Sequence, residues 1–376
     1  MTKNKTFTAY LSGVALLLGV CHAAEPDLLI PVDLLSRGGS NLSAGASGSP
    51  IFLSSGGLNL VIQPRSGGTL ANNAPALAAF SRAAATWSSY ITDDITVLID
   101  ADLRSFGVGN EQVIGGTMPV YLQGSYADVA GLLVGDAADE ADDGIVAALP
   151  DTLSIRTRTG IAFSGNVLLT KANAKALGLS ASTLDATVNT AFDAHIDFNS
   201  DFAFSYDRAT AAPGTIDFES VALHEIGHAL GFLSQTDAAD GAINGTTLSV
   251  TTLDLFRFAT ATKPTDEAGF TNGVRELTPG TAAGLSDVEN FYSMSTGVVG
   301  GDGRQASHWK DGDLTGTLIG ALDPTIDYGQ IFTLSNADLR ALDLIGYDIA
   351  SVPEPTVAWG AVVIFFALSR RRKAAC

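Results

Sequence analysis

Apolar side chains repeat at helical spacing from residue 75 to residue 90. The residues that share one face of such a helix are Leu77, Phe80, Ala84 and Trp87. Pro75 suits the first turn, where no backbone N–H is needed. The β-branched run at residues 95–99 alternates in the way that a half-buried strand does. The pattern therefore predicts a helix that leads into a sheet.

The rest of the chain carries fewer regular patterns. Helices are expected at residues 170–179, 217–231 and 335–347, and a strand at residues 194–199. Asp217 is placed to cap the second of these helices, and Gly231 suits its end. His195, on the strand, has no motif partner beside it, so we interpret it as an ordinary strand histidine.

Residues 234–303 show little periodicity and predict long loops with few regular elements. Helices that alternate with strands indicate a mixed α/β chain. We expect one domain over residues 25–350, with a first lobe at about 70–233 and a second at 234–350. Residues 25–69 are expected to form a pro-segment or the first strands.

The N-terminus is typical of a secretory signal peptide. Two lysines precede an apolar run over residues 10–20 and a small-residue pair at 23–24, so residues 1–24 are expected to be removed on export. A lipoprotein is the alternative reading of Cys21. Against it, Val20 stands where a small residue is expected before a lipidated cysteine.

The C-terminus, residues 351–376, has three parts. Pro353-Glu354-Pro355 is followed by a short apolar stretch and then by a basic cluster at residues 370–373, which stays cytoplasmic by the positive-inside rule. This ending resembles the PEP-CTERM sorting signal of Gram-negative bacteria that make exopolysaccharide. The resemblance implies transient membrane anchoring, cleavage by an exosortase-type processing enzyme, a cell-surface or extracellular location and contact with the exopolysaccharide matrix. The alternative is an ordinary membrane anchor.

Composition narrows the classes of partner. Only 16% of the 376 residues are charged and the formal net charge is −19, which disfavours nucleic-acid binding because phosphates require clustered basic side chains. Both cysteines, Cys21 and Cys376, lie in end segments that are expected to be removed, which leaves histidines and carboxylates as metal ligands. The acidic loop at residues 136–144 lacks EF-hand spacing, so we interpret it as a solvated acidic turn, with a Ca²⁺ site as the alternative.

The helix expected at residues 217–231 carries the sequence His224-Glu225-Ile226-Gly227-His228. Residues four apart lie on one face of a helix, so the two imidazoles can bind one Zn²⁺ at about 2.0–2.1 Å. Glu225 beside them can take a proton from the attacking water and pass it to the leaving amine. The motif points to metal-assisted hydrolysis of a peptide bond.

A catalytic zinc site usually takes three protein ligands, so a third must be found. Three residues after Gly231, where the compact metzincin pattern has its third ligand, stands Ser234, which is a poor ligand. The remaining downstream donors include several aspartates, Glu267, Glu276, Glu289 and His308. The residues alone leave the choice open, and a site with Glu289 in place of His308 would be a gluzincin.

Two motifs carry a resemblance to a known family. Residues 224–232 read His-Glu-Ile-Gly-His-Ala-Leu-Gly-Phe and residues 307–309 read Ser-His-Trp. In this order, with a long insertion between them, they resemble the leishmanolysin group of metzincins over about residues 217–347. The resemblance implies that His308 is the third zinc ligand and that a methionine turn follows. Leu322 stands at the place of that methionine, which packs beneath the metal and does not bind it.

The resemblance implies a two-lobed α/β (α+β) zincin, metzincin-like, with the zinc-ligand helix at the cleft floor. The expected function is a zinc metalloendopeptidase with Glu225 as catalytic residue and a protein or peptide substrate lying along a sheet edge. Tyr328 is a candidate oxyanion stabiliser, from its place after the third ligand only. The alternatives are a matrix or adhesion protein that keeps the zinc site without catalysis, and an exopolysaccharide-binding module.

Overall fold

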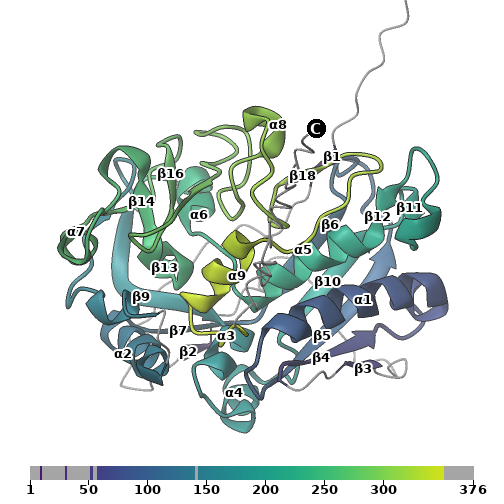
Figure 1. The fold of residues 1–376 in the computed structure, drawn as a ribbon, viewed down its shortest axis with the longest axis horizontal. Coiled ribbons are helices and arrows are strands. Elements are labelled where there is room, and N and C mark those ends of the chain that lie inside the picture. Colours follow the sequence, from purple (N-terminus) through teal and green to yellow (C-terminus); the bar gives the residue numbers. More distant parts are fainter. Residues whose placement is uncertain (1–8, 11–29, 32–50, 54–56, 140–142, 351–376) are drawn as a thin grey trace, which may run out of the picture.

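The computed structural model describes residues 9–10, 30–31, 51–53, 57–139 and 143–350 (Figure 1). The expected sorting signal, and the expected signal peptide apart from Ala9–Tyr10, lie outside these residues. In the described part of the chain, no helix combines the length and the apolar character that crossing a membrane requires. The predictions about targeting therefore stay predictions.

One five-stranded sheet, sheet I, has the strand order β3-β4-β5-β10-β6. Its strands are β3 (Ile51–Leu53), β4 (Asn59–Pro64), β5 (Thr96–Arg104), β6 (Gly115–Pro119) and β10 (Ala194–Asn199). Strands β4, β5 and β10 run parallel, whereas β3 and β6 run antiparallel to their neighbours. Strand β6 is therefore an antiparallel edge strand.

Two long helices, α1 (Ala74–Tyr90) and α5 (Phe218–Leu230), pack on one face of sheet I (Figure 1). Phe198 of β10 contacts Phe80 of α1 and Phe218 of α5, with ring centroids 5.2 and 4.5 Å apart. The indole of Trp87 donates to the carbonyl of Leu223 at 2.9 Å and joins the two helices. The helices predicted at residues 75–90 and 217–231 are thus confirmed.

The other face of sheet I is polar. Strand β5 continues five residues past the predicted end at residue 99, because its backbone pairs with β10 as far as Arg104. Asp100 lies on this polar face. Its carboxylate accepts from Arg65 at 2.6 Å and lies 2.9 Å from Nδ1 of His195. His195 is part of this ion-paired network on a strand, which agrees with its interpretation as an ordinary strand histidine.

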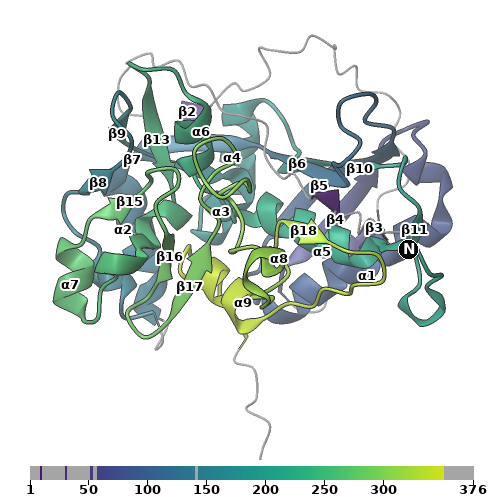
Figure 2. The same ribbon diagram turned by 90° about the horizontal axis from the view of Figure 1, so that it is seen from above.

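A second sheet, sheet II, has the order β13-β9-β7-β2. Its strands are β2 (Ile30–Pro31), β7 (Tyr121–Ser125), β9 (Ala162–Thr170) and β13 (Thr247–Thr251). Only Val120 separates β6 from β7, so one chain segment supplies the edge of sheet I and then a strand of sheet II. Figure 2 shows this segment, β6 followed by β7, running from sheet I to sheet II.

The prediction of long loops over residues 234–303 is wrong. A third sheet, sheet III, has the order β17-β16-β14-β15-β8. Its strands are β8 (Ile155–Arg156), β14 (Arg257–Ala259), β15 (Arg275–Glu276), β16 (Ala283–Ser286) and β17 (Phe291–Met294). Strands of two to four residues are too short to show an alternating pattern, and tertiary pairing stabilises them. The buried Arg257 and Arg275 obscure the pattern further.

Further elements complete the described chain. The other helices are α2 (Tyr126–Asp136), α3 (Lys171–Ala176), α4 (Ala181–Val188), α6 (Thr236–Gly241), α7 (Glu267–Asn272), α8 (Gly312–Thr315) and α9 (Asn336–Asp343). Two small sheets pair β1 (Ala9–Tyr10) with β18 (Thr325–Ile326), and β11 (Phe204–Ser205) with β12 (Ile216–Asp217). The chain is mixed α/β with several mixed sheets, which is compatible with the expected α+β class.

The acidic segment at residues 136–144 is described only in part. Asp136 ends α2, and Asp143 forms an ion pair with Arg340 of α9. Residues 140–142 lie outside the described residues. The solvated turn expected there, and the alternative Ca²⁺ site, both stay predictions.

Candidate metal centre

Helix α5 owes its boundaries to local chemistry. The carboxylate of Asp217 accepts from the backbone N–H of Ser220 at 3.0 Å, which caps the start. Gly231, at φ +126°, ends the helix in a conformation that other residues rarely adopt. Every side chain from Phe218 to Leu230 is buried. The helix therefore presents His224 and His228, one turn apart, to the protein interior.

His308 reaches the same place from a loop between β17 and α8. Its carbonyl accepts from the backbone N–H of Ser295 at 3.0 Å, and the next residue, Trp309, donates its backbone N–H to Leu322 at 2.9 Å. Backbone pairing on both sides thus holds the loop. The side chain of His308 is fully buried.

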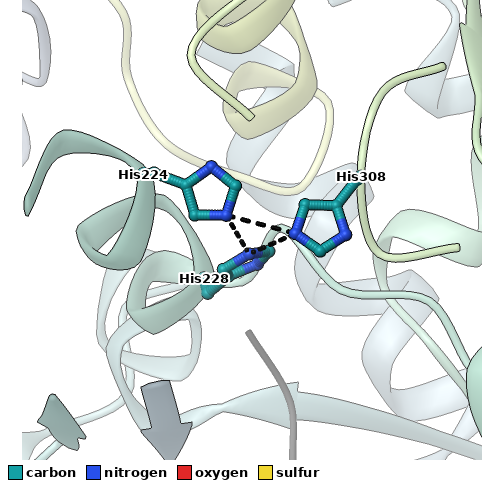
Figure 3. A group of neighbouring side chains, drawn as sticks. All are labelled: His224, His228 and His308. Atoms are coloured by element: carbon teal, nitrogen blue, oxygen red, sulfur yellow. Dashed lines mark hydrogen bonds between the residues drawn. The ribbon is translucent and has the colours of Figure 1, made fainter. Parts of the chain in front are cut away.

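The Nε2 atoms of the three histidines converge on one point (Figure 3). The His224 and His228 atoms lie 3.0 Å apart, those of His224 and His308 3.1 Å, and those of His228 and His308 3.2 Å. Nitrogen ligands of a tetrahedral zinc, each at about 2.0–2.1 Å from the metal, lie about 3.3–3.4 Å apart. The observed triangle therefore fits a small metal ion.

Each imidazole also has a backbone carbonyl at its other nitrogen. Nδ1 of His224 lies 2.9 Å from the oxygen of Ala321, that of His228 2.8 Å from Phe232, and that of His308 3.1 Å from Gln305. A carbonyl only accepts, so each Nδ1 carries the proton. The lone pairs of all three Nε2 atoms then face one another, which is the arrangement that metal-binding histidines adopt.

The electrostatics of the centre favour neutral imidazoles. Burial lowers the pKa of all three histidines, and that of His228 falls to about 4. Repulsion among the rings lowers the pKa of His224 and His308 further. At neutral pH the rings are uncharged, which is the form that binds a metal.

Glu225 lies on α5 next to the first histidine and faces strand β6. The hydroxyl of Thr117 donates to its Oε2 at 2.7 Å, while its buried Oε1 has no hydrogen-bond partner among the described residues. An ideal Cβ on Gly115 would lie 2.6 Å from that Oε1, so glycine leaves the room that the carboxylate occupies. Burial raises the pKa of Glu225 to about 8, and the hydrogen bond from Thr117 opposes the rise. A nearby divalent cation would lower this pKa.

The other sequence candidates lie elsewhere. Glu289 is exposed between β16 and β17, and Glu276 is paired with Arg156 at 3.0 Å. Tyr328, after β18, is 45% exposed. Among the described residues, the group that can hold a metal ion consists of His224, His228 and His308. Leu322, at the place of the expected methionine, packs against the ligand helix, where a Cβ on Gly227 would lie 2.9 Å from its Cδ1.

The sequence pattern did not reveal the partners of these side chains. Thr117 is an unremarkable strand residue by pattern, and the carbonyls of Ala321, Phe232 and Gln305 carry no side-chain signal. Gly115 gave no usable signal either, because no strand is predicted there and the glycine is the first residue of β6.

Comparison with models of known protein families, with curated proteins and with solved structures finds no match to this chain.

Proposed function

We propose that this chain is a zinc-dependent endopeptidase with a metzincin-like zincin fold. The observation that carries the proposal is the set of three buried imidazoles whose Nε2 lone pairs face one point, with a carboxylate beside them on the same helix. Three neutral nitrogen donors suit zinc and leave a coordination position for a reactant.

When bound, zinc would polarise the scissile carbonyl and lower the pKa of a water molecule enough for a base to deprotonate it at neutral pH. Glu225 would act as general base through Oε1, which has no hydrogen-bond partner in the described part of the chain, and would later return the proton to the leaving amine. Thr117 holds Oε2 and so fixes the direction in which Oε1 points.

The substrate would be an extended peptide that lies along strand β6. This strand is the edge of sheet I, and its residues Gly115 and Thr117 adjoin Glu225. Addition of a peptide to a sheet edge gives affinity through backbone hydrogen bonds with little dependence on sequence. Export, surface location, exosortase cleavage and contact with an exopolysaccharide matrix accompany this proposal, on the sequence motifs alone.

The main competing function is a matrix or adhesion protein that keeps the zinc site without catalysis. Glu225 argues against it, because its carboxylate is fully buried beside the histidines yet is not one of the three converging ligand atoms. A purely structural metal site has no use for such a group. The gluzincin alternative loses support because Glu289 is exposed.

The test is zinc content by mass spectrometry, together with casein hydrolysis, on the purified full-length chain. Wild type should hold one zinc and cleave, Glu225→Gln should hold zinc without cleaving, and His308→Ala should lose both. A wild-type chain that binds zinc but cleaves nothing would favour the adhesion alternative. Full zinc content in His308→Ala would refute the ligand set, and a Glu289→Ala chain then tests the gluzincin site.

A further inference from the structure

The carboxylate of Asp338 is a fully buried hydrogen-bonding centre close to the histidines in the fold. Asp338 occupies the first turn of α9, where its Oδ2 accepts from the backbone N–H and the hydroxyl of Ser335, at 2.8 and 2.9 Å. The capping box of α9 explains the first of these contacts. It does not explain the others.

The remaining contacts of Asp338 lead to the backbone around the metal centre. Its Oδ1 accepts from the indole Nε1 of Trp309 at 2.7 Å and from the N–H of Leu322 at 3.3 Å. Its Oδ2 accepts from the N–H of Ala321 at 2.8 Å. One carboxylate thus ties α9 to two separate chain segments.

Both segments belong to the support of the histidines. Trp309 follows His308 directly, so the hydrogen bond that anchors its indole restrains the segment that carries His308. The carbonyl of Ala321 lies 2.9 Å from Nδ1 of His224. The ring of Trp309 also packs against Phe232 at 4.7 Å, and the carbonyl of Phe232 lies 2.8 Å from Nδ1 of His228.

We propose that Asp338 is a positioning residue for the metal centre, which acts by fixing Trp309 and the 321–322 backbone and so orients the imidazoles. The proposal rests on the proposed function only for the identity of the metal. An amide cannot replace this carboxylate, because its NH₂ group would face the donors of Ala321 and Ser335 at the Oδ2 position, or that of Trp309 at Oδ1.

The experiment compares full-length wild type, Asp338→Asn, Trp309→Phe and Ser335→Ala. Trp309→Phe removes only the indole donor, and Ser335→Ala weakens the same helix cap without touching Trp309 or Ala321. Zinc affinity is measured against a competing chelator. Loss of groups that orient metal ligands typically weakens metal affinity about 10-fold to 100-fold. We expect that loss in the first two variants and less than about a 3-fold change in Ser335→Ala.

A second readout needs no metal. Nitrogen NMR of the metal-free chain, with labelled histidine, reports which ring nitrogen carries the proton. Wild type and Ser335→Ala should show His224 protonated at Nδ1, whereas Asp338→Asn should show a mixture of tautomers. If Asp338→Asn fails to fold, Trp309→Phe decides the question through its zinc affinity.

The outcomes separate the two proposals. A wild type that binds no zinc, yet shows the tautomer change in Asp338→Asn, would refute the proposed function and keep the positioning role. Unchanged zinc affinity in Trp309→Phe, or an equal loss in Ser335→Ala, would overturn the positioning role and leave the proposed function intact.

Discussion

The hydroxyl oxygen of Thr117 lies 2.7 Å from Oε2 of Glu225 and 2.9 Å from the backbone carbonyl oxygen of the same residue. This contact joins the edge strand of sheet I to helix α5, with both side chains buried. It is the one hydrogen bond that the structure gives to the carboxylate of Glu225 in the described part of the chain.

Replacing Thr117 by valine should therefore impair catalysis more than metal binding. A hydrogen bond to a charged group is worth about 1.5–3 kcal/mol, which corresponds to a fall of about 10-fold to 100-fold in kcat. Steady-state kinetics and zinc content would check this. Thr117→Ser keeps the hydroxyl and should stay within a few-fold of wild type. Equal kcat values for the valine and serine variants would show that the hydroxyl does not position Glu225.

A methyl group at position 115 should displace the carboxylate of Glu225. The added Cβ would lie 2.6 Å from Oε1 and 3.1 Å from Cγ1 of Val221. Because the end of the glutamate side chain can move, we expect a modest loss of unfolding free energy, about 1–3 kcal/mol, and at least a ~10-fold fall in kcat. Gly165→Ala, on strand β9 with no atom within 4 Å of the added Cβ, is the matched control. A Gly115→Ala enzyme with wild-type kcat would contradict the prediction.

Gly227 and Leu322 should show energetic coupling. Alanine is the better helix former by about 1 kcal/mol, but its Cβ at position 227 would lie 2.9 Å from Cδ1 of Leu322. We expect Gly227→Ala to lower the unfolding free energy of the metal-free chain by about 1–2 kcal/mol. In the Leu322→Ala background, where the contact is absent, the same change should raise the unfolding free energy. Urea denaturation of wild type, Gly227→Ala, Leu322→Ala and the double variant measures the coupling energy. Additive effects of the two substitutions would exclude the contact.

Asp93 should make stability depend on pH. Burial and repulsion from Asp348 raise the pKa of Asp93 from 3.8 to about 7. The folded chain then holds a proton that the unfolded chain releases, so the unfolding free energy falls as pH rises from about 4 to about 7 and then levels off. The total fall due to this group is on the order of 4 kcal/mol.

The comparison of Asp93→Asn with wild type isolates this contribution from that of the buried histidines, which act in the opposite direction. The asparagine oxygen can still accept from the N–H of Asp348, which lies 2.9 Å from the carboxylate. We expect the unfolding free energy of the variant, relative to that of wild type, to be higher at pH 8 than at pH 4.5, as measured by urea denaturation. Asp94→Asn, at an exposed neighbouring position, is the control. Parallel pH curves for wild type and Asp93→Asn would rule the effect out.

Local chemistry made several elements predictable from the sequence. The helix that carries His224 and His228 was found because Asp217 caps its start and Gly231 permits its end. The helix at residues 335–347 was found for a similar reason, since Ser335 and Asp338 form a capping box, although its regular part ends at Asp343. The strand predicted at residues 194–199 agrees with β10. These signals act within a few residues and need no tertiary contact.

The strands of sheet III escaped prediction for the opposite reason. Each of them is too short to bury a face alone, and two of them begin with arginines, Arg257 and Arg275, that fold into the interior. Arg275 is held by backbone carbonyls and by the rings of Phe258 and Phe270. From the sequence alone, a charged residue at such a position predicts a loop, because its buried partners are not visible in the pattern.

The sequence by itself determined the chemistry that is available: two histidines one helical turn apart, a glutamate beside them and a small set of further ligands. Only the tertiary structure showed which of these donors lies beside them: His308, whose segment pairs through its backbone with Ser295 and Leu322, meets histidines 80 and 84 residues earlier. The same is true of Thr117, which reaches Glu225 across 108 residues. The physical reason is that spacing along a helix fixes geometry locally, whereas contacts between distant segments depend on how the sheets and helices pack.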